Sequence, residues 1–451
     1  NKLLIYTKDG KKMKIAVAGT GYVGLVTGVC LASKGHKVTC VDVDENKVKK
    51  MQRGESPIYE PGLPELMKES MENLIFTTDY KSAYQDADVI FIGVGTPEKY
   101  DGSANLTYVF QVAKQIAQTA EKHCVVVLKS TVPIGTNDKI ESYIHNKQVN
   151  DVKIYVASNP EFLSQGTAVH DTLHASRIVI GVTEEYPADV LKQVYENFDA
   201  PKLVVERRSA EMIKYASNDF LALKISYINE IANLCETVGA DIEEVTAGMG
   251  FDERIGHRFL KSGIGYGGSC FPKDTKALNW FANFNDNELR TIKAAIEVNE
   301  NQKFKLVKKA KKYYNDFLFL NVAILGCTFK PGTDDLREAP SLVNIPILME
   351  DGAYIRVWDP VGQENFKKCF PEKIQYCSCI EDAIAGADLC LILTEWGEVK
   401  EFDIKKYEEL MKHPIVLDGR NCYNLSDFAN TRITYDSIGR RTVNPDLYIE
   451  K

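Results

Sequence analysis

The stretch that decides the fold is residues 15–42, IAVAGTGYVGLVTGVCLASKGHKVTCVD. It begins with an apolar run (15–18), passes through the glycine-rich segment Gly19–Gly24 and an apolar-faced segment (25–33), and ends in a second apolar run that stops at Asp42. Short apolar runs bounded by glycine are typical of buried strands, and the segment between them has helical spacing. The order therefore predicts the first βαβ unit of a parallel sheet.

The glycines of this stretch read Gly19-Thr20-Gly21-Tyr22-Val23-Gly24, and Asp42 follows at the end of the second predicted strand. In this context the GxGxxG pattern is typical of dinucleotide binding: Gly19 permits a tight turn, Gly21 lets the backbone approach a pyrophosphate, and Gly24 allows close helix–strand packing. Asp42 can accept hydrogen bonds from ribose hydroxyls and would repel a 2′-phosphate, and residues 43–52 contain no arginine. The sequence predicts NAD rather than NADP as cofactor, with a packing turn that binds no ligand as the alternative.

Length and composition bound the class of protein. The 451 residues are three times the ~150 expected of one domain, which indicates two or three domains. A hydrophobic fraction of 44% and a charged fraction of 26% are typical of a packed soluble protein. No apolar run approaches the ~18 residues of a membrane helix, and no signal-peptide pattern is present. We therefore expect no membrane association.

The net charge and the pattern of cysteines exclude further classes of protein. A net charge of −8 argues against nucleic-acid binding. The eleven cysteines are odd in number and contain no CxxC pair, so we expect neither a disulfide framework nor a metal site. A reducing cytoplasmic location fits this pattern best.

The first pattern recurs later in the chain. Further apolar runs at 89–94, 125–128 and 154–157 continue the first sheet, and strand signals vanish from Glu206 to about Val245, where apolar residues recur at helical spacing. A second helical block is predicted from about Thr275 to Tyr314. VAILG (322–326) then resembles IAVAG, and GADLCLILTEW (386–396) resembles DADVIFIGVGTP (86–97).

We therefore predict an α/β protein with two Rossmann-like doubly wound domains joined by a long central helical region. The predicted parts are an N-terminal extension (1–12), an NAD-binding domain (13–205), a central linker and dimerisation region (206–315) and a C-terminal domain (316–451). The second half lacks the third glycine of the fingerprint, because it reads Gly326-Cys327-Thr328-Phe329-Lys330. We expect it to bind something other than NAD.

The segment 263–274, GIGYGGSCFPKD, is the most informative for chemistry. Four glycines ahead of Cys270 let the backbone close around a ligand. A thiol at the start of a helix, with Lys273 nearby, is expected to have its pKa lowered toward thiolate. Asp274 lies one helical turn further on, so both groups can face one site. The alternative is a buried apolar cysteine like the other ten.

Three other segments are candidates for the same site. Residues 130–133 (STVP) and 158–163 (SNPEFL) each follow a predicted strand, where a doubly wound sheet places its ligands. Lys214 and Asn218 lie one helical turn apart in the middle region. Taken alone, Glu161 could be a solvated loop carboxylate, and the Lys214–Asn218 pair could be an exposed helix face.

Together these segments resemble the nucleotide-sugar 6-dehydrogenases, the UDP-glucose/GDP-mannose dehydrogenase family. GTGYVG, STVP, NPEFL, Lys214–Asn218, GGSCFPKD, FKPGTDDLRE (329–338) and DGR (418–420) occur in the family's order over nearly the whole chain from Met13. The segment YGGSCFPKD reads like the UDP-glucose branch. The resemblance implies an NAD-dependent four-electron oxidation of UDP-glucose to UDP-glucuronate, used in polysaccharide biosynthesis, with two NAD⁺ reduced per sugar. The alternatives are a dehydrogenase of GDP-mannose or UDP-N-acetylmannosamine, and a non-catalytic NAD-binding protein of the same fold.

The resemblance also implies residue roles. Cys270 forms a thiohemiacetal and then a thioester, Lys214 and Asn218 stabilise the developing oxyanion, Asp274 with Thr131 holds a proton-relaying water, and Glu161 is the acid/base of thioester hydrolysis. The implied NAD contacts are Gly19, Gly21, Tyr22, Val23, Gly24, Asp42, Lys47, Thr96, Thr131, Lys273 and Arg337. The implied substrate contacts are Glu161, Phe162, Leu163, Lys214, Asn218, Arg254, Phe259, Leu260, Lys261, Gly267, Phe329, Lys330 and Arg420.

Two further expectations come from the same comparison. The UDP part of the substrate is expected on the C-terminal half, and a homo-oligomer, at least a dimer, is expected because the arginine at the place of Arg254 reaches the partner's substrate in the family. One departure is present: many relatives carry Glu four residues after the glutamate of NPEFL, whereas this chain has Gln165. A carboxylate role at that position does not carry over.

Overall fold

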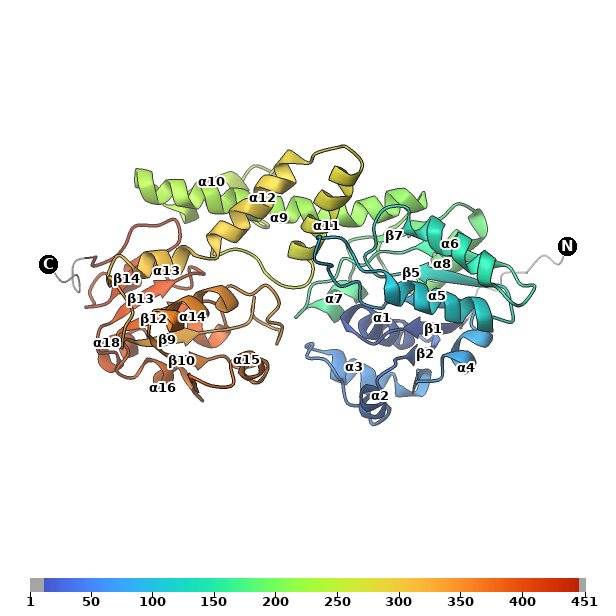
Figure 1. Ribbon diagram of the computed structural model, residues 1–451, viewed down its shortest axis with the longest axis horizontal. Coiled ribbons are helices and arrows are strands. Elements are labelled where there is room, and N and C mark those ends of the chain that lie inside the picture. The colour runs from blue at the N-terminus through green and yellow to red at the C-terminus, as the bar shows by residue number, and fades with distance from the viewer. Residues whose placement is uncertain (1–11, 446–451) are drawn as a thin grey trace. The chain divides into compact units, whose positions relative to one another are not determined.

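The computed structural model describes residues 12–445, and the chain divides into two compact units between Ser217 and Asn218 (Figure 1). The predicted N-terminal extension lies outside the described residues except for Lys12. The four-part division proposed above, with its boundaries at 205 and 315, stays a prediction.

The first unit is built on an eight-stranded sheet with the order β3-β2-β1-β4-β5-β6-β7-β8. Its strands are β1 Lys14–Ala18, β2 Lys37–Val41, β3 Leu74–Thr77, β4 Val89–Ile92, β5 Cys124–Leu128, β6 Ile154–Ser158, β7 Ile178–Gly181 and β8 Lys202–Val205. All neighbours are parallel except β6 and β7, which pair antiparallel at Ser158 and Gly181. The predicted parallel sheet is confirmed apart from that one pair.

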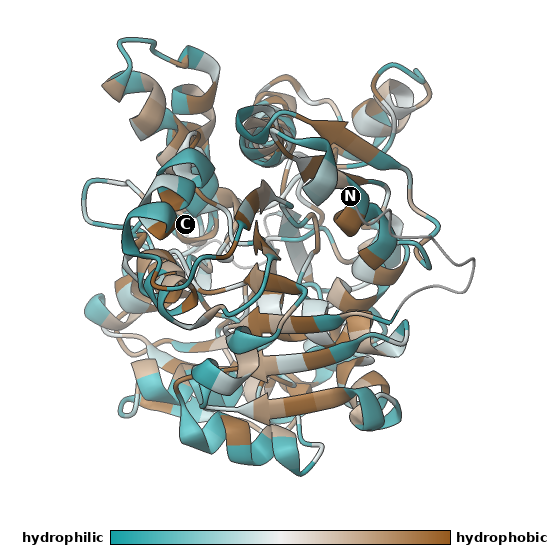
Figure 2. Ribbon diagram, turned by 90° about the vertical axis from the view of Figure 1, so that its right-hand side faces the viewer, coloured by the Kyte–Doolittle hydropathy of each residue, from teal (hydrophilic) through white to brown (hydrophobic). Residues whose placement is uncertain are grey.

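Helices cover both faces of this sheet. They are α1 Tyr22–Ser33, α2 Glu45–Gln52, α3 Leu63–Glu69, α4 Tyr80–Gln85, α5 Thr107–Thr119, α6 Thr136–Lys147, α7 Ala168–Leu173 and α8 Glu185–Val194, with a 3-10 turn η1 at Met71–Asn73. Successive strand residues point to opposite faces, so Val17 and Phe91 pack in one apolar cluster while Ala16 and Ile90 pack in another. The apolar character of the strands is visible in Figure 2.

The second unit repeats the pattern with six parallel strands in the order β11-β10-β9-β12-β13-β14. They are β9 Asn321–Leu325, β10 Tyr354–Trp358, β11 Ile374–Tyr376, β12 Leu389–Ile392, β13 Ile415–Asp418 and β14 Thr434–Ser437. In each sheet the first strand lies between the second and the fourth along the chain, and the order changes direction there. Two Rossmann-like doubly wound sheets are thus confirmed.

The helical region between the sheets differs in detail from the prediction. Its helices are α9 Arg207–Val238, α10 Ile242–Gly250, α11 Phe271–Phe284, α12 Arg290–Gln302 and α13 Lys305–Ala310. The predicted long central helix is confirmed as α9, but it stops before the end of the helical region at about Val245. Gly239 adopts φ 79° and its N–H donates to the Cys235 carbonyl, which ends α9. Asp241 then caps α10 by accepting from the Glu243 N–H. The predicted second helical block is present and consists of the three helices α11, α12 and α13.

The helices around the second sheet are shorter. They are α14 Ser341–Glu350, α15 Gln363–Cys369, α16 Ile380–Ile384, α17 Gly397–Lys400 and α18 Lys405–Leu410, with a 3-10 turn η2 at Leu425–Phe428. None of the helices in residues 12–445 is long and apolar enough to cross a membrane.

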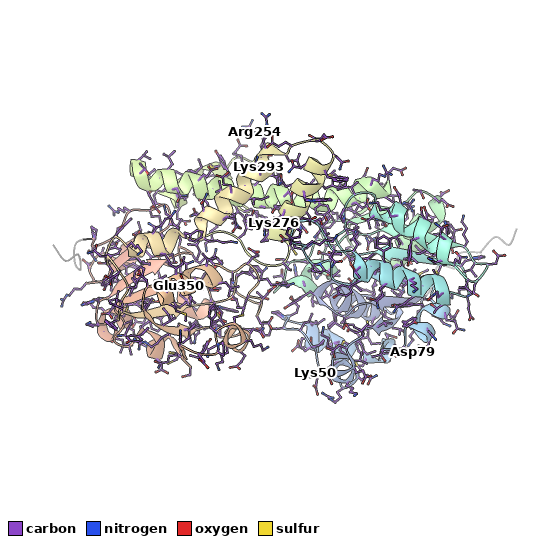
Figure 3. All side chains as sticks on the ribbon, in the orientation of Figure 1. Lys50, Asp79, Arg254, Lys276, Lys293 and Glu350 are labelled. Carbon is purple, nitrogen blue, oxygen red and sulfur yellow. The ribbon has the colours of Figure 1, made fainter. Side chains whose placement is uncertain are left out.

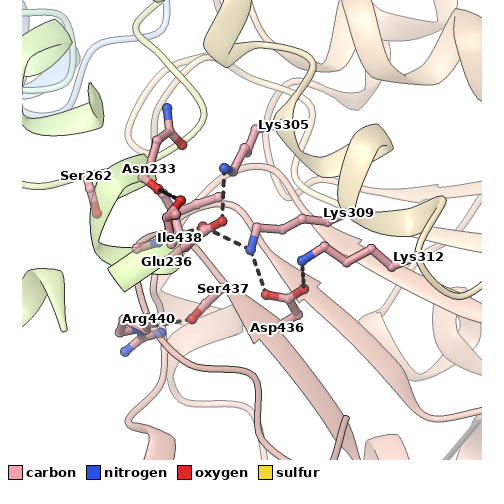
Figure 4. A network of polar contacts seen from close by, with 12 residues as sticks. Asn233, Glu236, Ser262, Lys305, Lys309, Lys312, Asp436, Ser437, Ile438 and Arg440 are labelled. Atoms are coloured by element: carbon pink, nitrogen blue, oxygen red, sulfur yellow. Dashed lines mark hydrogen bonds and ion pairs between the residues drawn. The ribbon is translucent and has the colours of Figure 1, made fainter. Parts of the chain in front are cut away.

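A buried charge network joins the end of α9 to the second sheet (Figure 4). Lys309 on α13 lies 2.7 Å from Asp436 on β14 and 3.0 Å from Glu236 on α9. Glu236 also accepts from Lys305 at 2.9 Å and from the Gly439 N–H. Burial raises the pKa of Glu236. The charge of Lys309 and the bonds from the Gly439 N–H and Lys305 outweigh burial and hold this pKa below its ordinary value. The network fixes the C-terminal end of α9 to α13 and β14.

Candidate active site

The glycine turn after β1 has the geometry expected of a dinucleotide cradle. Gly19 has φ 90°, which only glycine adopts readily, and a Cβ on Gly24 would lie 2.0 Å from the Gly19 carbonyl oxygen. A Cβ on Gly21 would meet nothing within 4 Å, so the backbone at the start of α1 is open to approach. Helix α1 carries no side-chain cap, which leaves its first N–H groups available for phosphate. The residues present therefore fit NAD.

Asp42 and its counterpart Asp359 follow equivalent strands, but their surroundings differ. Asp42 is half-buried and accepts from the Thr20 N–H at 2.9 Å and the Asp44 N–H at 3.0 Å. Although burial raises its pKa, these hydrogen bonds, that of the Thr20 hydroxyl and nearby Lys47 hold it below its ordinary value. Asp359 is fully buried and accepts from four backbone N–H groups and the Trp396 indole. Of these two aspartates, Asp42 is therefore the one that a ribose could reach.

The ends of β4 and β5 are held together by the residues predicted beside the cofactor. The Thr96 hydroxyl donates to the Thr131 carbonyl at 2.9 Å, and the Ser130 hydroxyl donates to the Val94 carbonyl at 2.6 Å. Tyr22 donates to the Tyr59 carbonyl at 2.7 Å. Thr96 and Thr131 are thus brought together in the first unit.

Glu161 and Lys214 form a buried ion pair within the first unit. Lys214 Nζ on α9 lies 2.8 Å from Glu161 Oε1, which follows β6, and the two side chains are 3% and 5% exposed. Glu161 Oε2 accepts from the Leu163 N–H at 2.7 Å. The Phe162 ring lies under both Lys214 and the Arg177 guanidinium. Glu161 is therefore not the solvated loop carboxylate of the alternative interpretation.

A second buried lysine, Lys129, lies near this pair and was not predicted from the sequence. Lys129, at the end of β5, donates to Asn159 Oδ1 at 2.9 Å, and Tyr195 donates to the same oxygen at 2.5 Å. Burial lowers the pKa of Lys129 to about 8, with Glu161 opposing and Lys214 reinforcing the shift. The one sequence feature that could have indicated this buried lysine is its position directly after the apolar run 124–128.

Gln165, the departure from the family pattern, is buried in the loop after Glu161. Its Oε1 atom has no hydrogen-bond partner among residues 12–445. The neighbouring Gly166 N–H and Ala168 N–H both donate to the buried Glu60 carboxylate, at 2.8 and 2.7 Å. Glu60 thereby fixes the loop that carries Glu161 and Gln165.

In the second unit, Cys270 stands at the start of α11. It is half-buried, it is the residue before Phe271, and its Sγ lies 3.8 Å from the Ser269 hydroxyl. None of the eleven cysteines forms a disulfide, and most of the others are buried. The Asp274 N–H donates to the Cys270 carbonyl at 2.8 Å, so the predicted one-turn spacing is present.

Asp274 is buried and both its oxygens are engaged. Asn218 donates to Oδ2 at 2.7 Å and Lys273 donates to Oδ1 at 2.7 Å. Each carboxylate oxygen can accept more than one hydrogen bond, so these contacts do not exhaust the group. Three predicted site residues, Asn218, Lys273 and Asp274, thus lie together, and Asp274 is one helical turn from Cys270.

A second aspartate beside Asp274 was not predicted from the sequence. Asp219 is 2% exposed, and neither of its oxygens has a hydrogen-bond partner among the described residues. Burial and the nearby charge of Asp274 raise its pKa to about 8. Because Asp219 follows Asn218 directly, helical spacing alone gave no sign that it too is buried.

The predicted substrate residues of the C-terminal half surround the same glycine loop. Arg420 donates to the Gly265 carbonyl at 3.1 Å, the Leu393 carbonyl at 2.9 Å and the Phe329 carbonyl at 3.4 Å. Lys330 lies over the Phe329 ring, and a Cβ on Gly267 or Gly268 would collide with Phe329. Arg420, Phe329, Lys330 and the loop before Cys270 therefore lie together in this unit.

The remaining predicted residues lie on exposed turns or nearby. Arg254 projects from the fold with an 89% exposed side chain and pairs with Asp252 at 2.6 Å (Figure 3). Phe259 and Lys261 are exposed, whereas Leu260 is buried. Arg337 donates from Nε to Asp335 Oδ1 at 2.9 Å and from Nη2 to Asp335 Oδ2 at 2.6 Å, a bidentate pair. Within residues 12–445 no group of His, Cys, Asp or Glu is arranged to hold a metal ion.

The fold and this site define an NAD-dependent dehydrogenase with two Rossmann-like halves. Three models of the UDP-glucose/GDP-mannose dehydrogenase family match the chain: its NAD binding domain at residues 13–199, its central domain at 208–301 and its UDP binding domain at 323–425. The chain belongs to this family.

Individual relatives agree with the family models. UDP-glucose 6-dehydrogenase YwqF of Bacillus subtilis is 50% identical over 440 residues, which cover 97% of this chain and 100% of that protein. The structure of a UDP-glucose dehydrogenase from Pyrobaculum islandicum has a TM-score of 0.90 at 35% identity and covers 97% of this chain and 100% of that one. The structure of a UDP-D-ManNAc dehydrogenase from Pyrococcus horikoshii has a TM-score of 0.84 at 27% identity, with 95% and 99% covered.

Proposed function

We propose that this protein oxidises UDP-glucose to UDP-glucuronate with NAD⁺, and that Cys270 is the covalent nucleophile. The observation that carries the proposal is the Cys270 thiol at the start of α11, with the buried Asp274 one turn later. The choice of sugar is supported by the higher identity to the UDP-glucose enzyme (50%) than to the UDP-D-ManNAc enzyme (27%).

NAD⁺, when bound, accepts a hydride in each of the two oxidations. The Gly19–Gly24 turn and α1 would hold its pyrophosphate, and Asp42 would accept from its ribose hydroxyls. The other proposed contacts in the first unit are Tyr22, Val23, Lys47, Thr96 and Thr131. Lys273 and Arg337 are the proposed contacts in the second unit.

Cys270 supplies the covalent chemistry. Its sulfur adds to the C6 aldehyde and forms a thiohemiacetal, which keeps the aldehyde attached for the second oxidation to a thioester. The start of a helix favours the thiolate form that this addition needs. Water then adds to the thioester carbon, the C–S bond breaks, and the carboxylate leaves with the thiolate regenerated.

The neighbouring residues handle charge and protons. We assign Lys214 and Asn218 to the developing oxyanion, and Asp274 with Thr131 to the water that takes the proton of the C6 hydroxyl. Glu161 accepts the proton of the hydrolytic water. The Lys214–Glu161 pair supports these roles because each group is buried and held in a fixed position by the other.

The UDP part is assigned to the second unit. Lys330 and Arg420 each follow a strand end, and both can contact a diphosphate. Leu260, Lys261, Gly267 and Phe329 complete this set, and Phe162 and Leu163 are assigned to the sugar.

The test is NAD⁺ reduction with a panel of nucleotide sugars. The proposal predicts about two NADH per UDP-glucose consumed, with UDP-glucuronate as product. Oxidation of GDP-mannose or a UDP-N-acetylhexosamine without oxidation of UDP-glucose would refute it. Binding of NAD without turnover of any sugar would favour the non-catalytic alternative.

A homodimer is part of the proposal. Phe220, Tyr227 and Leu234 are exposed on α9 at intervals of seven residues, so they form one apolar stripe. A second copy of the chain would bury this stripe, and Arg254 is sufficiently exposed to reach a partner. An active monomer in sedimentation would contradict the dimer.

The free thiols favour a reducing compartment, which we propose to be the cytoplasm.

A further inference from the structure

The loop that precedes Cys270 is in direct contact with the backbone at residues 337–338. The Gly268 N–H donates to the Arg337 carbonyl at 2.7 Å. A Cβ on Gly267 would lie 2.5 Å from the Glu338 carbonyl oxygen, so the two backbones leave no room between them. A displacement of residues 337–338 would therefore move the loop that ends at the thiol.

Glu338 holds an uncommon backbone conformation at this contact. Its φ is 55°, in the left-handed region that non-glycine residues rarely adopt, and such a conformation persists only where the surroundings fix it. The Asp335 carbonyl, which accepts from the Phe329 N–H at 3.2 Å, fixes one side of the segment. The Glu338 side chain fixes the other.

That side chain is anchored by two lysines. Lys303, which follows α12 and is only 2% exposed, lies 2.8 Å from Glu338 Oε2. Lys276, on the helix α11 that begins after Cys270, lies 3.5 Å from Oε1. Burial raises the pKa of Glu338. The two lysines, Lys303 and Lys276, outweigh burial and hold this pKa below its ordinary value. Glu338 is therefore a carboxylate at neutral pH that bridges α11 and the end of α12.

We propose that Lys303 and Glu338 are positioning residues for the Cys270 loop: their ion pair holds the strained backbone at Glu338, which in turn holds Gly267 and Gly268. The inference rests on the proposed role of Cys270 as nucleophile. Neither residue needs to touch the substrate, because the backbone transmits the effect. A loss of position of about 1 Å is enough to cost a reaction up to about a hundredfold in rate.

A matched pair of variants separates positioning from simple charge balance. Glu300 Oε1 also lies 2.9 Å from Lys303 Nζ, but it belongs to α12 and not to the segment 337–338 that contacts Gly267 and Gly268. Glu338→Gln and Glu300→Gln each remove one negative charge from Lys303 and preserve side-chain shape. Glu338→Asp keeps the charge and serves as the conservative variant.

The readouts are steady-state kinetics and thiol reactivity. Cys270 alkylation by iodoacetamide is followed by peptide mass spectrometry without substrate, with the exposed Cys369 as internal reference. We expect Glu338→Gln to change the Cys270 rate by about threefold or more relative to Cys369, and to lower kcat about tenfold with little change in KM. Glu300→Gln should match wild type within about twofold, and Glu338→Asp should recover most of kcat.

Equal alkylation rates and equal kcat for Glu338→Gln and Glu300→Gln would overturn the positioning role. Recovery by Glu338→Asp together with an altered Cys270 rate in Glu338→Gln would support it. The alkylation measurement needs no substrate, so it decides the positioning role even if the wild-type protein fails to oxidise UDP-glucose, a result that would refute the proposed function instead.

Discussion

Lys214 Nζ lies 2.8 Å from Glu161 Oε1, and both side chains are almost completely removed from water. Breaking such a pair from one side leaves an uncompensated buried charge, whereas replacing both partners by neutral groups removes the desolvation cost as well. The effect of the pair on stability and its proposed role in the chemistry can therefore be separated by mutation.

A double-mutant cycle on this pair is the first prediction. Lys214→Met should lower the free energy of unfolding by about 3 kcal/mol because Glu161 is left buried and unpaired. The double variant Lys214→Met, Glu161→Gln should recover most of this loss, while turnover remains abolished in both. Denaturant unfolding and NADH formation are the measurements. Equal stability of the single and double variants would contradict the account.

Glu161→Gln alone gives the second prediction. The amide preserves the side-chain shape but cannot accept the proton of the hydrolytic water, so thioester hydrolysis should become rate-limiting. Rapid mixing should then yield a burst of NADH, and intact-protein mass spectrometry should detect the sugar nucleotide attached at Cys270. The result that counts against this role is normal steady-state turnover.

The glycines of the turn after β1 give a third prediction, in which folding and binding separate. Gly24→Ala places a Cβ 2.0 Å from the Gly19 carbonyl oxygen and should destabilise the first unit by about 3 kcal/mol. The Cβ added in Gly21→Ala meets nothing within 4 Å, so this variant should change the free energy of unfolding by less than about 1 kcal/mol. It should nevertheless weaken NAD⁺ binding about tenfold or more, because the backbone at the pyrophosphate is blocked.

Thermal unfolding and NAD⁺ titration by calorimetry test this contrast. Gly21→Ala is its own folding control, since its melting temperature should match that of wild type. Undiminished NAD⁺ affinity in Gly21→Ala would contradict the assignment of this turn to the pyrophosphate.

Asp219 predicts a specific pH dependence of stability. Its pKa is raised to about 8, so between its unfolded value near 4 and pH 8 the folded state binds more protons than the unfolded state. The contribution of Asp219 to the free energy of unfolding therefore becomes increasingly unfavourable as pH rises through that range. Asp219→Asn removes the cost and should stabilise the protein by up to about 5 kcal/mol at pH 8, with little effect near pH 4.

Chemical denaturation at several pH values measures this difference. Glu297→Gln, a change at an exposed carboxylate on α12, is the control and should leave the stability curve unchanged. A pH-independent effect of Asp219→Asn would show that Asp219 is ionised in the folded protein.

The sequence predicted the sheets and the glycine turn because both depend on local patterns. Apolar runs, the spacing of Gly19, Gly21 and Gly24, and a terminal aspartate are properties of a few adjacent residues. The residues around Cys270 were found for the same reason, since Asp274 lies one helical turn away.

The buried charges could not be predicted in this way. Lys129 is buried beside Asn159 and Tyr195, which are distant in sequence, and Asp219 lies buried near the charge of Asp274, which is 55 residues further along the chain. A lysine or aspartate is usually exposed, so composition and periodicity favour the surface. The end of α9 at Gly239 was missed because the apolar spacing continues into α10 across a three-residue turn.

The central claim, covalent catalysis by Cys270, is tested most directly by the NADH yield per UDP-glucose in Cys270→Ala. The account predicts that this variant still binds UDP-glucose and NAD⁺ but forms no UDP-glucuronate, while Cys270→Ser stalls because the ester it forms hydrolyses poorly. Two NADH per UDP-glucose at a near wild-type rate in Cys270→Ala would contradict it.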